Sequence, residues 1–185
     1  MKEIGGLSEF KNLLVAGGLP ELGPGPRDGV LPFMELNETL NALLDQPAVP
    51  AGAAEVVRGL ILLWHDHLDE AHLVVQAIEN ADGSFIHGLL HRREPDFPNA
   101  CYWFRRVGQH AAYPKLAARV TALLNTPAGL KLHSKLIVNG KWDALAFVKL
   151  CEQVAGKPEA DLEAQLTRKI QGLETEVLLE HFLSS

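Results

Sequence analysis

The sequence predicts an all-α protein, folded as an irregular helical bundle. From residue 33 onward, apolar residues recur every three or four positions in one segment after another, which is the spacing of a helix face. No two segments show the strict alternation of apolar and polar residues that indicates paired strands. With 185 residues, of which 47% are apolar, the chain is long enough to bury one core. We therefore expect a single domain over residues 1–185, with its helical body at 33–185.

The first 32 residues differ from the rest and are expected to form an extended arm. The segment GGLPELGPGPRDG, residues 17–29, contains too much glycine and proline for a helix or a central strand. Before it, Ser8–Val15 has the pattern of a short helix with Ser8 as its N-cap. We expect the arm to lie ordered across the helical body, and a mobile tail is the alternative.

Two helices are expected between residues 33 and 80. Phe33–Leu44 carries its apolar residues at helical spacing and stops before Pro47. Ala53–Asn80 has one continuous apolar stripe, so it is expected to be the longest helix of the protein. Gly59 is a weak point in that helix, but a single glycine is tolerated there.

Proline and turn residues divide the second half of the chain. Asp82-Gly83-Ser84 is expected to form a turn, with Ser84 as the N-cap of a helix that runs to Glu94 and is ended by Pro95. A segment at Leu130–Val138 fits either a short helix or a strand. The further expected helices are Pro98–Gln109, Pro114–Leu124, Trp142–Val154 and Glu159–Phe182.

Composition argues against several classes of protein. The net charge of −6 disfavours a nucleic-acid-binding surface, and no apolar run reaches the roughly 18 residues that a membrane span needs. Cys101 and Cys151 lie far apart and match no metal or redox motif, which is typical of a reduced cytoplasmic protein. We expect a cytoplasmic protein that binds a small molecule, and its amphipathic last helix could pair in a homodimer.

Residues 64–110 hold six of the eight histidines and give the main functional hypothesis. On a wheel of the long helix, one polar row borders the apolar stripe. On the next helix, a second polar row is spaced i, i+4, i+7. The short connecting turn makes the two helices antiparallel neighbours, so we expect the rows to face each other. The first row consists of His65, Asp69, His72 and Gln76, and the second of His87, His91 and Glu94.

Imidazole and carboxylate groups in one small volume are typical of a site for a divalent transition metal such as zinc, iron, manganese or nickel. We expect His72, His87 and His91 to be metal ligands, with His65 as an additional or outer ligand. Asp69 or Glu94 would be a fourth ligand or the catalytic base. Three protein ligands leave a position for water, whose lowered pKa supplies hydroxide for hydrolysis. Iron oxygenase chemistry is the alternative for the same ligands.

Two other interpretations of these rows stay open. Without a metal, a histidine paired with a carboxylate could act as a general base. The rows could also be a buried polar network that serves only the packing of the helices. The spacing matches neither the HExxH motif nor the di-iron motif of helical bundles, so it does not by itself select one interpretation.

Arginines beside the second row suggest an anionic ligand. Arg92, Arg93 and Arg106, together with Gln76, are the expected ligand-binding residues, because a guanidinium group can hold a carboxylate or phosphate through two hydrogen bonds. Ordinary ion pairs are the alternative, and Trp103 is expected to pack in the core. The favoured function is therefore a small-molecule enzyme using metal-assisted hydrolysis. The alternative is a non-enzymatic module that binds a small anion.

Two stretches in this region carry a resemblance. WHDHLDEAH and IHGLLHRREPDFPNACYWFRRVG, within residues 64–108, resemble a segment shared by a family of uncharacterised bacterial and fungal proteins. The resemblance covers about a quarter of the chain and implies no activity. It implies that the family pattern includes His87, His91, Arg92, Arg93, Glu94, Asp96, Asn99, Tyr102, Trp103 and Arg106.

Overall fold

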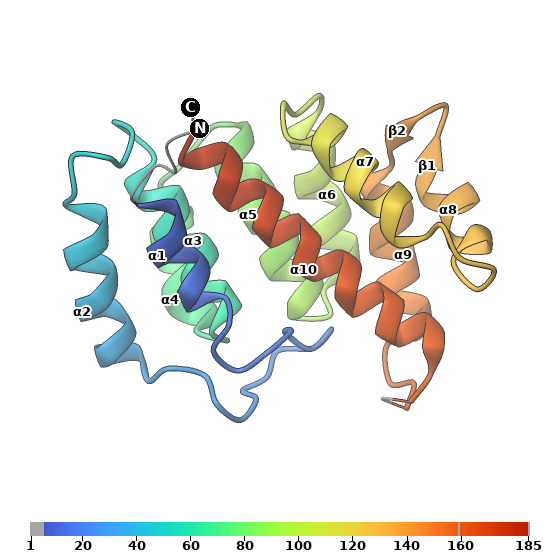
Figure 1. Cartoon of the computed structure of the whole chain (residues 1–185), viewed down its shortest axis with the longest axis horizontal. Coiled ribbons are helices and arrows are strands. Elements are labelled where there is room, and N and C mark those ends of the chain that lie inside the picture. The colour runs from blue at the N-terminus through green and yellow to red at the C-terminus, as the bar shows by residue number, and fades with distance from the viewer. Residues whose placement is uncertain (1–5, 159, 185) are drawn as a thin grey trace.

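A computed structural model of the chain describes residues 6–158 and 160–184, which form ten helices and one two-stranded sheet (Figure 1). The all-α prediction is confirmed for these residues. Strand β1 (Ile137–Val138) pairs antiparallel with β2 (Lys141–Trp142). The helices are α1 (Leu7–Leu13), α2 (Phe33–Leu44), α3 (Ala54–Trp64), α4 (Leu68–Val75), α5 (Ala81–Arg93), α6 (Phe97–Val107), α7 (Tyr113–Leu123), α8 (Leu130–Leu136), α9 (Ala144–Val154) and α10 (Leu162–Phe182).

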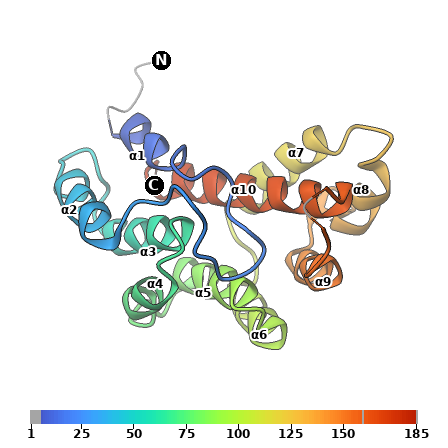
Figure 2. The ribbon, with the colours of Figure 1, turned by 90° about the horizontal axis from the view of Figure 1, so that it is seen from below.

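Helix α5 lies at the centre of the bundle, and every residue from Gly83 to Arg93 is buried. It packs between α4 and α6, while the long helix α10 crosses the molecule and contacts α3, α7 and α9 (Figures 1 and 2). One hydrophobic cluster takes side chains from all ten of the described helices. Each fully buried aliphatic or aromatic side chain contributes about 1.5–3 kcal/mol, so this shared cluster is the main source of stability.

Two glycines allow neighbouring helices to approach closely. A methyl group on Gly59 of α3 would collide with Val75 of α4, and one on Gly88 of α5 would lie 2.8 Å from the Phe104 ring of α6. Because close-packed interiors do not absorb such overlap, both contacts need glycine. Gly59, expected to be only a tolerated weak point, is therefore the position where α4 packs against α3.

The expected continuous helix Ala53–Asn80 is wrong, because the chain folds back on itself at residues 65–67. Asp66 there has a positive φ of 63°, which ends the helix. Its carboxylate accepts hydrogen bonds from Arg27 Nη1 and Arg93 Nη2, both at 2.6 Å, and from the Arg27 backbone N–H at 2.9 Å. Both halves keep the same apolar spacing, so the sequence pattern does not reveal the break.

Other boundaries differ from expectation because side chains cap the helices elsewhere. Helix α5 begins at Ala81, since the Asn80 side chain accepts a hydrogen bond from the Gly83 N–H at 2.9 Å. The expected turn at residues 82–84 is thus the first turn of that helix. Helix α10 is capped by Asp161, and the expected start at Glu159 lies outside the described residues. The ambiguous segment Leu130–Val138 contains both α8 and β1.

The N-terminal region is not confirmed as an extended arm over residues 1–32. Residues 1–5 lie outside the described part of the chain, and Leu7–Leu13 form α1, close to the expected Ser8–Val15. The residues from 14 to 32 contain no helix or strand. Backbone groups of this segment bind the helical body, since the Leu19 carbonyl accepts from Arg168 and the Glu21 carbonyl from Gln171.

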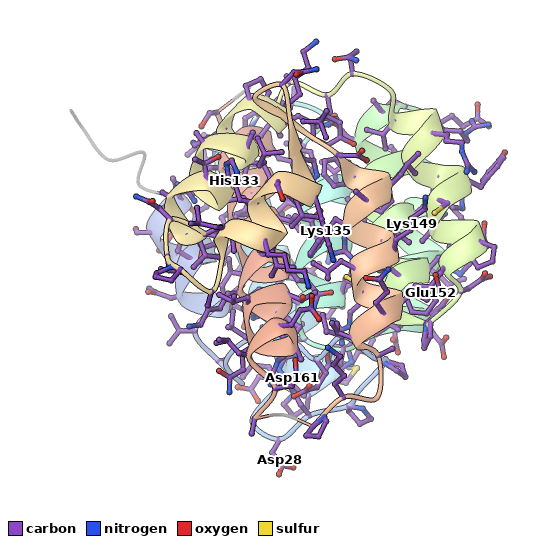
Figure 3. All side chains as sticks on the ribbon, turned by 90° about the vertical axis from the view of Figure 1, so that its right-hand side faces the viewer. Asp28, His133, Lys135, Lys149, Glu152 and Asp161 are labelled. Carbon is purple, nitrogen blue, oxygen red and sulfur yellow. The ribbon has the colours of Figure 1, made fainter. Side chains whose placement is uncertain are left out.

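Helix α9 shows how the outer helices divide into two faces. Lys149 and Glu152 lie on its outward side (Figure 3), whereas Phe147, Val148 and Cys151 are buried. This amphipathic pattern agrees with a helix on the edge of a water-exposed bundle. Among the described residues, no helix combines the length and apolar character that a membrane span requires.

Candidate functional site

Three histidines come together where α4 packs against α5. The ring centroid of His72 on α4 lies 5.4 Å from that of His87 and 5.4 Å from that of His91, and the last two are 6.2 Å apart. His87 and His91 are neighbours because a spacing of four residues places them on one face of α5. They are 3% and 7% exposed, while His72 is half-buried. The structure therefore brings together the three residues expected to be metal ligands.

The rings of His87 and His91 are each held through their own Nδ1 atom. His87 Nδ1 contacts the Gly83 carbonyl at 3.1 Å, and His91 Nδ1 contacts the Glu94 carboxylate at 2.8 Å. A carbonyl or carboxylate oxygen can only accept, so each Nδ1 carries the proton and each neutral ring keeps its lone pair on Nε2. This is how the outer shell of a metal site orients histidine ligands.

The ring centroids lie near the distances that one ion requires, but the ring nitrogens do not converge in this structure. Three imidazoles that bind a zinc ion at about 2.0–2.1 Å with tetrahedral angles have ring centroids about 5 Å apart, and those of His87 and His91 are 6.2 Å apart. Among the described residues, ligand atoms within 4.8 Å of one another occur at Asp82, His110 and His181 and not at these three histidines, so a metal here requires the rings to turn. Burial lowers the pKa of His87, the Gly83 carbonyl opposes this shift, and the charges of His72, His91 and Arg106 lower the pKa further. His87 is thus neutral at neutral pH, as metal binding requires.

Helix α6 adds aromatic and cationic groups to the histidine cluster. The Trp103 ring stacks on His87, with centroids 4.1 Å apart and planes inclined by 13°. The Arg106 guanidinium lies 5.3 Å from the Trp103 ring centroid and 5.8 Å from that of Tyr102, and Nη1 donates to the Tyr102 hydroxyl at 3.3 Å. Trp103 therefore lies against the histidines and only half-buried, rather than inside the core as expected.

His65 lies apart from the cluster, contrary to expectation. Its ring is fully buried, Nε2 donates to the Leu13 carbonyl at 3.0 Å, and Nδ1 accepts from the Leu31 N–H at 3.2 Å. Neither nitrogen is left for a metal ion. The prediction of one row for His65 and His72 assumed a straight helix. The break in the helix at Asp66 directs the two side chains to different places.

Acidification should destabilise the fold through His65. Burial lowers its pKa to about 4, whereas an unfolded histidine titrates near 6.5. Between these values only the unfolded state binds the proton, so the stability contributed by neutral His65 is complete above pH 6.5 and is lost as the pH falls to 4. The loss amounts to about 3 kcal/mol. Urea unfolding at a series of pH values measures this slope, and an unchanged slope in His65→Gln would contradict the assignment.

Two of the three arginines expected to bind a ligand are internal instead. Arg93 donates to the Gly23 carbonyl through Nε at 2.6 Å, to the Leu63 carbonyl and to Asp66. Arg92 is 1% exposed and pairs with the fully buried Glu174 of α10. Because these guanidinium groups already hold the helices together, neither is open to a ligand. Both make the ion pairs that the alternative interpretation describes.

Two further expected site residues lie on the exposed side of α4. Asp69 is exposed, and so is Gln76, whose side chain donates to the Leu73 carbonyl of the same helix at 3.3 Å. Neither makes a contact with the three histidines among the interactions of the described residues. Both were expected to face the second row, and their side chains instead point to solvent.

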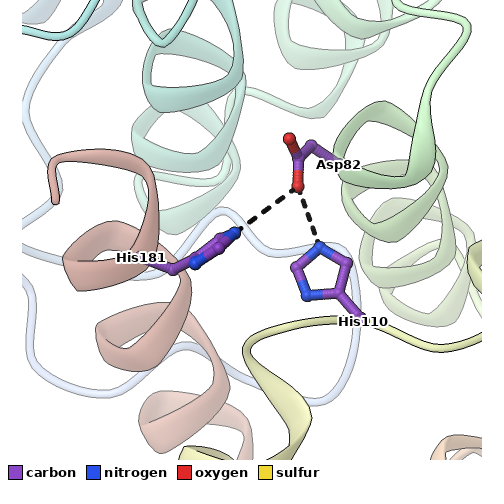
Figure 4. A group of neighbouring side chains, drawn as sticks. All are labelled: Asp82, His110 and His181. Carbon is purple, nitrogen blue, oxygen red and sulfur yellow. Dashed lines mark hydrogen bonds and ion pairs between the residues drawn. The ribbon is translucent and has the colours of Figure 1, made fainter. Parts of the chain in front are cut away.

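A second group, missed in the sequence, joins Asp82, His110 and His181 (Figure 4). Asp82 Oδ1 lies 2.8 Å from His110 Nε2 and 4.0 Å from His181 Nε2. One ligand atom from each residue lies within 4.8 Å of the others, so this group could hold a metal ion. The residues come from the start of α5, the α6–α7 connection and the end of α10. Such distant positions leave no local sequence signal.

The protonation of His110 opposes metal binding at this second group. Its Nδ1 accepts a hydrogen bond from the Ala112 N–H at 3.1 Å, so the proton sits on Nε2 and is donated to Asp82. That hydrogen bond from His110 lowers the pKa of Asp82. A metal on Nε2 would require the proton to move to Nδ1 and the Ala112 contact to break. His87 and His91 already carry the proton on Nδ1, but their ring nitrogens and those of His72 are not all within the 4.8 Å that this second group satisfies.

A cavity of about 330 Å³ lies away from both groups, between residues 21–23, the α5–α6 turn and the α9–α10 connection. Its charged side chains already have partners: Arg168 pairs with Glu21 at 2.9 Å and Lys157 with Glu163 at 2.7 Å. No histidine lines this cavity. Its composition gives no reaction, so we place the candidate site at the His72, His87 and His91 cluster.

A comparison of the chain with protein-family models, curated proteins and solved structures finds no match. The functional interpretation therefore depends on the geometry of the site, and the family resemblance of residues 64–108 stays a prediction.

Proposed function

We propose that this protein is a metal-dependent enzyme that hydrolyses a small-molecule substrate. His72, His87 and His91 would bind one divalent transition metal through ring nitrogens. The observation that supports this most is the pair of fixed rings: Nδ1 of His87 and of His91 is held by an oxygen acceptor, which leaves both Nε2 lone pairs free, and the His72 ring centroid lies 5.4 Å from each of the two rings. Three imidazole ligands and an open position favour zinc among the candidate metals.

The carboxylates would have different roles from one another. Glu94 contacts His91 Nδ1, so we assign it as a positioning residue that orients the ring, in place of the expected role as ligand or base. Asp69 precedes His72 by three residues on α4; it is exposed and contacts none of the three histidines directly, so it would act on the site through water. We propose Asp69 as the base that takes a proton from the attacking water. The metal would supply water of lowered pKa and polarise the bond to be broken.

Zinc-dependent hydrolysis is the expected result in a simple assay. The zinc-loaded protein should hydrolyse p-nitrophenyl acetate or p-nitrophenyl phosphate, and removal of zinc with a chelator should lower the rate about 100-fold or more. His91→Ala should behave like the zinc-free protein because a ligand is lost. His110→Ala is the matched control, since it changes a histidine of the second group, and it should keep the activity.

Two results of this assay would contradict the proposal. Equal rates with and without zinc would reject the metal-activated water. A loss in His110→Ala together with full activity in His91→Ala would assign the reaction to the group at Asp82 instead.

A further inference from the structure

Arg106 has an environment unlike that of the buried arginines. Arg27 and Arg93 donate to Asp66, and Arg92 pairs with Glu174. Arg106, in contrast, is exposed and contacts only Tyr102 and Trp103 among the interactions of the described residues. The ring contacts and the Tyr102 hydroxyl hold the guanidinium in place without neutralising its charge. A fixed, uncompensated guanidinium is suited to bind a carboxylate or phosphate.

The position of Arg106 connects this charge to the histidines. Trp103 stacks on His87 and Arg106 lies over Trp103, so the two contact distances of 4.1 and 5.3 Å limit the separation of the guanidinium carbon from the His87 ring centroid to less than about 10 Å. The charge of Arg106 is one of the influences that lower the pKa of His87, after burial and the neighbouring histidines. A single small molecule can therefore reach both Arg106 and a metal held by the histidines.

Tyr102 adds a second group to the same place. Its hydroxyl oxygen accepts the hydrogen bond from Arg106 Nη1 at 3.3 Å, which leaves the hydroxyl hydrogen to donate elsewhere. Tyr102 is 50% exposed, so this hydrogen is within reach of a molecule from solution. Guanidinium and hydroxyl together offer an anion three or more hydrogen-bond donors on one short stretch of α6.

We infer that the site takes an anionic substrate, whose carboxylate or phosphate group binds Arg106 and Tyr102 while the bond to be hydrolysed lies at the histidines. This inference rests on the proposed function for the position of the reacting bond. The anion contact itself involves only side chains of this chain, so it can be tested in the absence of metal.

The test is a titration of metal-free protein with inorganic phosphate and, separately, with acetate. Binding is followed by the fluorescence of Trp103, which Trp103→Phe identifies, and by the heat of binding. Arg106→Ala should weaken binding of the preferred anion about tenfold or more, because a charge-assisted hydrogen-bonded pair is lost. Arg106→Lys keeps the positive charge but loses the paired N–H donors of the planar guanidinium group, so its effect on anion binding should be intermediate.

Arg105→Ala is the matched control, because Arg105 is also exposed and is adjacent, but its position lies about 100° away around α6. It should bind the anions like the unchanged protein. Equal binding by Arg106→Ala and the unchanged protein would overturn the inference, as would an equal loss in Arg105→Ala, which would indicate a general surface charge effect. The titration is done without metal, so an absence of anion binding would not count against the metal site. In the same way, an absence of metal binding would not count against anion binding at Arg106.

Discussion

Asp66→Ala is expected to lower the free energy of unfolding by about 3–5 kcal/mol, because it leaves two buried guanidinium groups without their carboxylate. The Asp66 side chain is 0% exposed, and the side chains of Arg27 and Arg93 are 8% and 3% exposed. Asp66 also has a positive φ of 63°, which aspartate and asparagine tolerate better than alanine. Loss of charge compensation and backbone strain act in the same direction.

Urea unfolding followed by circular dichroism measures this change. Asp28→Ala is the control, since Asp28 is exposed in the same N-terminal segment as Arg27 (Figure 3), and it should change stability by less than about 0.5 kcal/mol. Asp66→Gly accommodates the positive φ, so its difference from Asp66→Ala separates strain from charge. A loss below about 1 kcal/mol in Asp66→Ala would contradict the role assigned to this carboxylate.

Glu174→Ala is expected to lower the free energy of unfolding by a similar amount, about 3–5 kcal/mol. Glu174 is fully buried and pairs with Arg92 at 2.5 Å, which joins α10 to α5. Arg92 also lies over the Phe147 ring, with its guanidinium carbon 4.6 Å from the centroid, so it cannot turn toward water without leaving the core. Burial raises the pKa of Glu174, and the guanidinium of Arg92 opposes this shift.

A double variant distinguishes the loss of an interaction from the burial of a lone charge. Replacing both partners, as Arg92→Met with Glu174→Leu, should destabilise less than either single change, because no uncompensated charge remains. Glu176→Ala is the control on the same helix: this residue pairs with Arg119 at 3.3 Å on the surface and should change stability by at most about 1 kcal/mol. Additive losses in the double variant would show that the pair is not coupled.

The contact between Asp66 and Arg93 also helps to position the clustered histidines. Asp66 lies just before α4, and Arg93 lies two residues after His91 on α5. Their contact holds α4 against α5, and these helices carry the three clustered histidines. A change at Asp66 that the fold survives should therefore loosen the position of His72 relative to His91.

The sequence predicts the helices better than their connection. Apolar spacing located α2 at its observed bounds and placed His87 and His91 on one face, because these features depend only on neighbouring residues. The break at Asp66 depends on Arg27 and Arg93, which are 39 and 27 residues away in the chain. A local pattern does not contain that information.

The same limit applies to the chemical roles of single residues. Arg92 and Arg93 follow His91 directly, so charge alone suggested a ligand site, yet both point into the bundle and meet Glu174 and Asp66. The group of Asp82, His110 and His181 was missed for the complementary reason. Its members meet only through the packing of α10 and the α6–α7 connection against α5.

The proposed metal site is tested by the metal content per chain, measured by mass spectrometry on untagged protein loaded with zinc and then desalted. We expect one equivalent of zinc in the unchanged protein and in His110→Ala, and less than about a tenth of an equivalent in His87→Ala and in His91→Ala, because each loses one of three ligands. A chain that retains no zinc, iron, manganese or nickel under these conditions would contradict the metal site. Zinc retained in His87→Ala but lost in His110→Ala would place the metal at Asp82, His110 and His181 instead.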